Sequence, residues 1–251
     1  MLTDAELDRY ARHIVLPHVG GAGQIKLKGA RILVIGAGGI GSAAIPSLAA
    51  AGTEMLRIVD DDTVSLSNLQ RQTLFVTADI GRSKVGAAAE RITALNPHVA
   101  VDPREIRADA GSLPALLDGM DLVLDGCDNF ATRLAVSDAA TVARVPLISA
   151  AIAQFQGQVG TFRGWEADLP CYRCFVGDAL DPDDCDSCAE QGVLGALVTM
   201  VGGFAAMEAM RAIIGFGEDA AGKLHVIDGL APAWRCIALP KDPGCSTCSR
   251  L

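Results

Sequence analysis

The chain has 251 residues and a mass of 26.0 kDa, and half of its residues are hydrophobic. This length and apolar content suit one large domain, or two small ones, with a sizeable buried core. The formal net charge of −9 excludes the basic surface by which nucleic-acid-binding domains attract phosphate, so we expect no nucleic-acid partner.

The amino-terminal segment predicts a short helix followed by a connection. Thr3 and Glu6 form a capping box, in which each side chain can accept a hydrogen bond from the other residue's backbone amide, and an amphipathic stretch continues to residue 16. This segment lacks the apolar core of a signal peptide, which predicts a cytoplasmic protein. The glycine-rich residues 20–29 are predicted to be a connection.

Between residues 30 and 153, buried strands alternate with helices. The sequence predicts a strand, a glycine turn and a helix over 30–52, further strands at 55–60, 99–106, 121–128 and 146–152, and helices at 83–97 and 130–143. Pro103 indicates that the strand at 99–106 is an edge strand or ends early. The alternation implies right-handed βαβ units and a Rossmann-like α/β fold with a mostly parallel sheet.

After residue 153 the pattern changes to short strands separated by turns. Strands at 157–164, 223–229 and 234–240 are predicted to extend the same sheet in antiparallel fashion. Glu208 and Arg211 interrupt the apolar stretch 193–214, which therefore predicts a buried helix and no membrane span. We predict one domain over 1–251, with a nucleotide-binding part at about 28–153 and a second part at about 154–251.

The sequence GAGGIG at 36–41 has the G-x-G-x-x-G spacing of a phosphate-binding turn. It lies between a predicted strand and a predicted helix, where free backbone amides and the helix dipole attract phosphate. Asp60 ends the next strand, where a carboxylate can bind a ribose hydroxyl. The motif fits an NAD-dependent dehydrogenase, an enzyme that binds a nucleoside triphosphate, or a glycine turn without a ligand.

Charged residues beyond this turn favour the triphosphate. Asn68 and Arg71 lie in the polar connection 60–75, and Lys84 lies near the start of the next helix. Such cations suit the larger charge of a triphosphate and can stabilise charge that develops during transfer at phosphorus.

The segment DGCDN at 125–129 ends another core strand. Asp128 is therefore placed to hold Mg²⁺ against phosphate oxygens, because ligands in such sheets bind beyond the carboxyl ends of the strands. Asp125 is more buried in the strand pattern and is interpreted as structural. Asn129 either caps the following helix or contacts the nucleotide.

Several segments in chain order resemble the MoeB/ThiF/HesA family, the bacterial relatives of ubiquitin-activating enzymes. They are RYARHIVLP, GAGGIGS, DDDTVSLSNLQRQ, GRSKV, LDGCDNFATR, PCYRC and PGCSTC. The resemblance covers nearly the whole chain and implies an adenylyltransferase that uses ATP and Mg²⁺. Its substrate would be the C-terminal glycine carboxylate of a ubiquitin-like sulfur-carrier protein of the MoaD or ThiS type, and a separate protein would donate the sulfur.

The resemblance places the chain closer to the molybdopterin branch of this family than to the thiazole branch. The thiazole branch, a dehydrogenase and a non-catalytic scaffold that only binds the carrier remain alternatives. The motifs and the resemblance together give these candidate nucleotide-site residues: Gly36, Gly38, Gly39, Gly41, Asp60, Ser67, Asn68, Arg71, Lys84, Asp128 and Asn129. Arg133 is a further candidate. Arg12 would reach the ATP of a neighbouring subunit, which implies a homodimer.

Six of the eight cysteines form three C-x-x-C pairs: 171/174, 185/188 and 245/248. Two pairs suffice for one tetrahedral zinc, and spacing alone leaves open which pair joins Cys171 and Cys174. The aspartates around 178–186 indicate an exposed loop, which favours a distant partner pair.

The resemblance implies a zinc site of Cys171, Cys174, Cys245 and Cys248. It places Cys188 in a crossover loop, where the residue takes part in sulfur transfer in ThiF-like members and is dispensable in MoeB-like members. Cys127 and Cys236 are predicted to be core residues.

Overall fold

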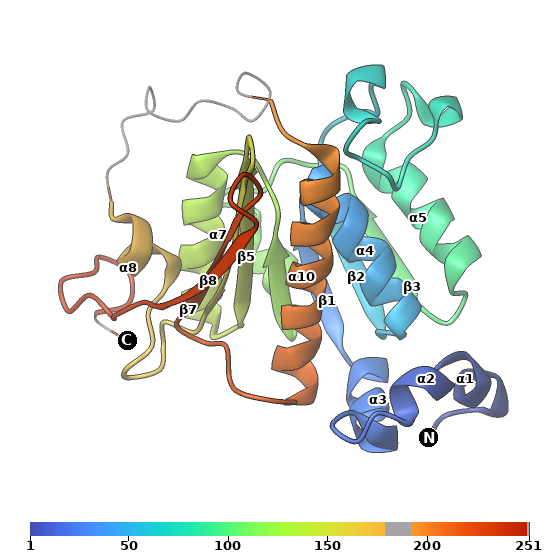
Figure 1. Cartoon of the computed structure of the whole chain (residues 1–251), viewed down its shortest axis with the longest axis horizontal. Coiled ribbons are helices and arrows are strands. Elements are labelled where there is room, and N and C mark those ends of the chain that lie inside the picture. Colours follow the sequence, from blue (N-terminus) through green and yellow to red (C-terminus); the bar gives the residue numbers. More distant parts are fainter. Residues whose placement is uncertain (179–191, 250) are drawn as a thin grey trace.

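The computed structural model describes residues 1–178, 192–249 and 251, and its centre is an eight-stranded sheet (Figure 1). The strand order is β3-β2-β1-β4-β5-β6-β7-β8. Neighbours from β3 to β5 run parallel, and β6, β7 and β8 continue antiparallel, which confirms the predicted fold class. The strands are β1 Arg31–Ile35, β2 Met55–Val59, β3 Ala100–Arg104, β4 Leu122–Asp125, β5 Leu147–Ala153, β6 Gln156–Phe162, β7 Lys223–Asp228 and β8 Ala233–Ala238.

Helices cover both faces of the sheet because its central strands are apolar on both sides. Along β1, Ile32 and Val34 pack with helices α4, α5 and α10, whereas Leu33 and Ile35 pack with α6, α7 and α8. The helices are α1 Asp4–Arg9, α2 Ala11–Ile14, α3 Gly20–Lys28, α4 Gly39–Ala51, α5 Lys84–Leu95, α6 Leu113–Leu117, α7 Phe130–Ala143, α8 Tyr172–Val176 and α10 Gly195–Ile214, with short 3-10 turns at Leu66–Asn68 and Thr77–Asp79.

The capping box at the start of α1 is present as predicted. The predicted connection at 20–29 is wrong, because these residues form α3. Gln24 and Leu27 of α3 are fully buried, and the Gln24 amide donates a 2.7 Å hydrogen bond to the Ala51 carbonyl. Packing against the ends of α4 and α10 therefore outweighs the low helix propensity of its glycines.

The apolar helix α10 has the length and composition of a membrane span. In the fold it lies alongside α4 across the sheet (Figure 1). Half of its most apolar window is buried, and buried Glu208 pairs with Arg211 at 3.0 Å. α10 is thus a core helix of this domain, as the interrupted apolar pattern predicted.

The two edges of the sheet are β3 and β8. β3 contains Pro103 and is an edge strand that ends at Arg104, in agreement with the two alternatives that Pro103 indicated. The prediction that Cys236 is a core residue is wrong, because no strand covers the outer side of β8 in the described structure and Cys236 is exposed there. Cys127 is half-buried just beyond β4.

Candidate active site

The glycine turn joins β1 to α4 at the centre of the sheet. Gly36 has a positive φ of +89°, which a side chain would strain. A Cβ on Gly41 would lie 2.1 Å from the Gly36 carbonyl oxygen, so this position also excludes larger residues. The tight turn directs the first backbone amides of α4 toward the space beyond the carboxyl ends of the strands, where an anion can bind.

Asp60, directly after β2, holds this turn from the neighbouring strand. Its carboxylate accepts hydrogen bonds from the amide of Ala37 at 2.8 Å and from the amide of Asp62 at 2.9 Å. Burial raises the pKa of the Asp60 carboxyl, and the Lys84 ammonium 3.8 Å away opposes that shift. Lys84 is 4 % exposed and donates to Asp62 at 2.7 Å, so its charge is held in place before any ligand binds.

The polar connection after β2 brings Arg71 and Gln72 over the start of α4. Arg71 is half-buried and donates to the Ser67 carbonyl at 3.1 Å. Asn68 accepts through its backbone carbonyl from the amides of Arg71 and Gln72 at 3.0 and 2.9 Å. The 3-10 turn therefore fixes the direction in which Arg71 leaves the backbone.

At the end of β4 and just beyond it, Asp125 and Asp128 take the different positions that the sequence predicted. Asp125 is 1 % exposed and its carboxylate accepts from the amide of Cys127 at 3.0 Å. Asp128 is exposed, and Asn129 accepts from the Thr132 amide at 2.9 Å as the N-cap of α7. Burial raises the pKa of the Cys127 thiol well above its usual value, so this cysteine is a poor nucleophile.

One cleft of about 630 Å³ unites these features at the carboxyl ends of β1, β2, β4 and β5. It lies at the point where the strand order reverses between β1 and β4, the usual ligand site of such sheets. The predicted residues that line it are Gly36, Gly38, Gly39, Asp60, Arg71, Lys84, Asp128, Asn129 and Arg133. Gly41, Ser67, Asn68 and exposed Arg12 on α2 are not among the residues that line it within this chain.

Four cysteines meet at α8: Cys171 and Cys174 lie at its start and within it, and Cys245 and Cys248 come from the C-terminal segment. Figure 1 shows this segment running beside α8. Cys171 Sγ lies 3.8 Å from Cys174 Sγ and 3.5 Å from Cys245 Sγ, and Cys174 Sγ lies 3.4 Å from Cys248 Sγ. A tetrahedral zinc with sulfur ligands at about 2.3 Å places its sulfurs about 3.8 Å apart, so the cluster fits this ion. The pairing of 171/174 with 245/248 is as predicted, and Cys185 and Cys188 lie outside the described residues.

The chemistry of the four thiols also suits a cation. Burial raises the pKa of the Cys171 thiol. Burial and a hydrogen bond with the Cys174 thiol together raise the pKa of the Cys248 thiol to about 11. Burial acts in the same direction on Cys245, but the amides of Cys248 and Thr247 outweigh it and lower that pKa. Four sulfurs this close share a compact site in which a divalent ion can replace the thiol protons.

Residues 10–247 match the ThiF family along almost the whole chain. The chain belongs to the ThiF family. The sulfur carrier protein adenylyltransferase of Thermus thermophilus is 41% identical over 249 residues, covering 98% of this chain and 92% of that protein. The molybdopterin-synthase adenylyltransferase of Escherichia coli is 40% identical over 249 residues, covering 99% of each chain.

Solved structures agree with the fold of this ThiF family member. A crystal structure of Escherichia coli MccB with ATP superposes with a TM-score of 0.83 at 21% identity, covering 96% of this chain and 74% of that chain. At this identity the likeness concerns the fold alone. The resemblance to this family, which the sequence motifs indicated, is confirmed.

Sequence reasoning missed several residues that line the cleft. Gln72 is 4 % exposed, and its Oε1 has no hydrogen-bond partner within the described part of the chain. Its place beside Arg71 in the motif was an available signal. Tyr172, Phe175 and Val176 of α8 also line the cleft. The sequence offers no sign that these three residues line a cleft, because there they stand out only as neighbours of Cys171 and Cys174.

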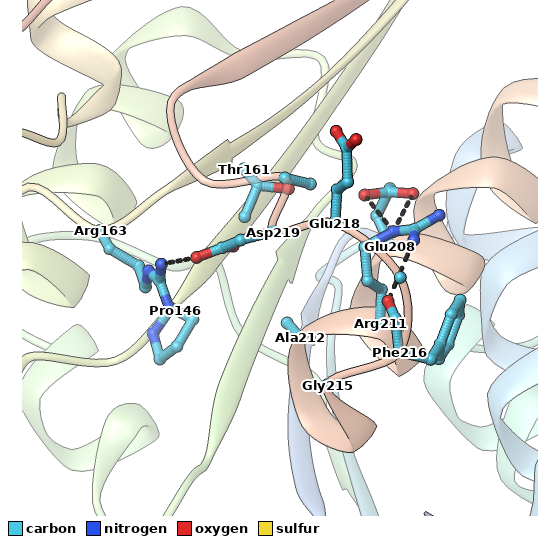
Figure 2. A pocket seen from close by; sticks show the side chains of 12 residues that line it. Pro146, Thr161, Arg163, Glu208, Arg211, Ala212, Gly215, Phe216, Glu218 and Asp219 are labelled. Atoms are coloured by element: carbon cyan, nitrogen blue, oxygen red, sulfur yellow. Dashed lines mark hydrogen bonds and ion pairs between the residues drawn. The ribbon is translucent and has the colours of Figure 1, made fainter. Parts of the chain in front are cut away.

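A second cavity, of about 220 Å³, lies at the opposite end of the strands, beside Pro146 before β5 and the last turn of α10. In Figure 2 two charged pairs of the cavity wall point toward one another, whereas Glu218 pairs with Lys223, which does not line the cavity. Arg211 pairs with Glu208 and donates to the Phe216 carbonyl, and Arg163 pairs with Asp219. These charges neutralise one another, so we place the chemistry in the larger cleft.

Proposed function

We propose that the chain is an ATP-dependent adenylyltransferase acting on the C-terminal glycine carboxylate of a ubiquitin-like sulfur-carrier protein of the molybdopterin-synthase type. The observation that carries this proposal is the single cleft where the glycine turn, Asp60, Arg71, Lys84 and Asp128 meet. The full-length similarity to the Thermus and Escherichia coli adenylyltransferases supports the same reaction and the same class of substrate. This similarity also favours adenylation over NAD-dependent hydride transfer as the reaction.

The reaction requires positioning and charge neutralisation more than proton transfer. The carrier's terminal carboxylate is ionised at neutral pH and attacks the α-phosphorus of ATP without a general base. A bond forms between a carboxylate oxygen and that phosphorus, the bond to the β-phosphate oxygen breaks, and pyrophosphate leaves. The product is a mixed anhydride of the carrier and AMP, which a separate sulfur donor would convert to a thiocarboxylate.

Each residue of the cleft has a role in this proposal. The amides at the start of α4 bind phosphate oxygens, and Asp60 accepts a hydrogen bond from a ribose hydroxyl through its remaining lone pairs. Arg71 and Lys84 stabilise the charge that grows on the departing pyrophosphate, while Ser67 and Asn68 orient Arg71. Asp128 would hold Mg²⁺, which neutralises phosphate charge when bound, and Asn129 would contact the nucleotide from the α7 N-cap.

Two further features complete the proposal. The chain works as one domain in a cytoplasmic homodimer, in which Arg12 on the exposed surface of α2 reaches the cleft of the partner subunit. Zinc occupies the cluster of Cys171, Cys174, Cys245 and Cys248 and fixes the C-terminal segment to α8.

Pyrophosphate exchange into ATP tests the function and the choice of carrier together. The purified protein should exchange labelled pyrophosphate only when a molybdopterin-type carrier with an intact terminal glycine is present. A carrier shortened by that glycine is the matched control and should give no exchange. Faster exchange with a thiazole-type carrier would move the protein to the thiazole branch, and exchange with neither carrier would contradict the proposed function.

A further inference from the structure

Gln72 lies in the wall of the cleft with one end of its side-chain amide unpaired. The residue is 4 % exposed, and its Oε1 has no hydrogen-bond partner among the residues that the structure describes. Gln72 is also one of the residues that line the cleft. A buried polar atom without a partner lowers stability, and such costs are characteristic of binding sites. Packing alone therefore does not explain a glutamine at this position.

The backbone around Gln72 fixes the position of its side chain. The Gln72 amide donates to the Asn68 carbonyl at 2.9 Å, and the Gln72 carbonyl accepts from the Phe75 amide at 3.2 Å. Leu74 and Phe75, which follow in the chain, are buried in the core. These contacts hold the chain on both sides of Gln72, so the position of the side-chain amide does not depend on a partner for Oε1.

The nitrogen of the same side-chain amide lies at the start of α4. A Cβ on Gly38 would lie 3.8 Å from Gln72 Nε2. Gly38 is the N-cap of α4, a helix of 13 residues, and this N-cap makes no side-chain hydrogen bond to the first amides. Uncapped amides and the positive end of the helix dipole attract an anion. Gln72 Nε2 thus adds a neutral N–H donor to the place where α4 attracts phosphate.

A neutral donor matters at this place because charged side chains that line the cleft compensate one another. Lys84 donates to Asp62 at 2.7 Å, and Arg107 pairs with Asp61 at 3.1 Å. All four side chains line the cleft, so a bound polyphosphate meets carboxylates as well as cations. Amide N–H groups attract phosphate oxygens without bringing a counter-charge. A glutamine here therefore strengthens phosphate binding, whereas a further carboxylate would weaken it.

We propose that Gln72 is a phosphate-binding residue of the cleft, whose Nε2 donates a hydrogen bond to a phosphate oxygen of ATP beside the first amides of α4. Phosphate oxygens of ATP accept hydrogen bonds, so bound ATP requires Nε2 toward the cleft and leaves Oε1 on the buried side. This inference rests on the proposed function, because it takes ATP as the ligand. It extends the phosphate site beyond the glycine turn, Arg71 and Lys84.

Gln72→Met tests the role of the donor. Methionine keeps an unbranched side chain of similar length but cannot donate a hydrogen bond. Because a hydrogen bond to a charged group is lost, the affinity for ATP should fall about tenfold in calorimetric titration. Gln72→Glu, which has the same shape and places a carboxylate beside the phosphates, should weaken ATP binding further.

Two further measurements separate a phosphate contact from a structural role. Without nucleotide, Gln72→Met should unfold at the same temperature as the unmodified protein or at a higher one, because it removes the unpaired Oε1. Adenosine, which has the base and the ribose but no phosphate, should bind both proteins equally. A structural glutamine predicts the opposite pattern, a lower unfolding temperature with unchanged ATP affinity. If Gln72→Met does not fold, Gln72→Asn, which withdraws the amide by one methylene, should show the same selective loss of ATP binding.

Gln70→Met is the matched control, because Gln70 lies in the same connection, is exposed and does not line the cleft. It should bind ATP like the unmodified protein. Unchanged ATP affinity in Gln72→Met, or an equal loss of affinity for ATP and for adenosine, would overturn the role of Gln72 while the proposed function stands. Absence of ATP binding by the unmodified protein would overturn the proposed function and, with it, this inference.

Discussion

The amide of Ala37, in the turn after β1, donates a 2.8 Å hydrogen bond to the carboxylate of Asp60 at the end of β2. The same carboxylate accepts from the Asp62 amide at 2.9 Å, so one side chain fixes two loops of the cleft. Because β1 and β2 pair in parallel register, both loops leave the sheet at the same edge. The phosphate turn is consequently held in shape by the residue that we expect to bind the ribose.

Asp60→Ala should weaken ATP binding at least tenfold, which corresponds to about 1.4 kcal/mol. The substitution removes a ribose acceptor and frees the turn at Ala37. Calorimetric titration with ATP measures the effect. Asp8→Ala on the exposed side of α1 is the control and should bind ATP normally; equal affinities of the two variants would contradict the role of Asp60.

Arg71→Ala and Lys84→Ala should each lower carrier-dependent pyrophosphate exchange at least tenfold, a barrier increase of about 1.4 kcal/mol or more. Both side chains lie in the cleft, where their charge offsets that of the phosphates. Arg91→Ala on α5, which removes only an exposed 3.7 Å ion pair with Asp79, should leave exchange nearly unchanged. Near-normal exchange in both cleft variants would refute the site assignment.

An Arg12→Ala protein mixed with a Lys84→Ala protein tests whether sites are shared between subunits. Each variant alone should be nearly inactive. After the subunits exchange, half of the sites in mixed dimers combine an intact Lys84 with an intact Arg12 from the partner, so about a quarter of the full activity should return. No recovery, with mixed dimers verified by native mass spectrometry, would rule out a contribution of Arg12 in trans.

Replacing Cys245 and Cys248 by serine should abolish zinc binding and lower thermal stability, because thiolate ligands provide folding energy in such sites. Replacing Cys185 and Cys188 in the same way should keep one zinc per chain. Metal analysis of the two purified double variants distinguishes the pairs. If the Cys245/Cys248 variant kept its zinc and the Cys185/Cys188 variant lost it, the partner of the 171/174 pair would be 185/188 and not 245/248.

Glu6 predicts a pH dependence of stability at the amino terminus. Hydrogen bonds from Lys28 and from Thr3 lower the pKa of Glu6 from 4.5 to about 2. A lowered pKa means that the folded state favours the charged carboxylate, so its stabilisation is fully present above pH 4.5 and is lost as the pH falls toward 2.

Glu6→Gln should therefore lower the free energy of unfolding at pH 7 by about 1 kcal/mol, the value of a partly exposed ion pair. Urea unfolding of both proteins should give a difference that shrinks between pH 4.5 and pH 3. Glu54→Gln, which loses only an exposed 3.8 Å contact with Arg31, is the control. A difference that grows on acidification would show that the sign of the Glu6 shift is wrong.

The sequence predicts this fold well wherever a local pattern and the tertiary structure agree. The turn from β1 to α4 follows from its glycines, and α7 follows from an apolar period between Asn129 and Ala143. α3 could not be predicted, because its glycines have low helix propensity and its stability comes from packing of Gln24 and Leu27.

In the candidate site, too, some residues follow from a local pattern and others depend on the tertiary structure. Asp60, Lys84 and Asp128 could be located because parallel strands end at one edge of the sheet. The cysteine pairs required the family resemblance, since residues 74 positions apart meet only in the fold. The contact of Tyr172 with Phe162 has no sequence signature at all, because it joins α8 to β6 through the interior.

Intact-mass analysis of the carrier after incubation with the protein and MgATP tests the central claim most directly. The account predicts a carrier species heavier by one AMP, attached at the terminal glycine and discharged by added pyrophosphate. Asp128→Asn, a change of one side-chain atom, should greatly reduce it. A carrier of unchanged mass under conditions in which ATP is bound, or an adduct that forms equally with Asp128→Asn, would contradict the account.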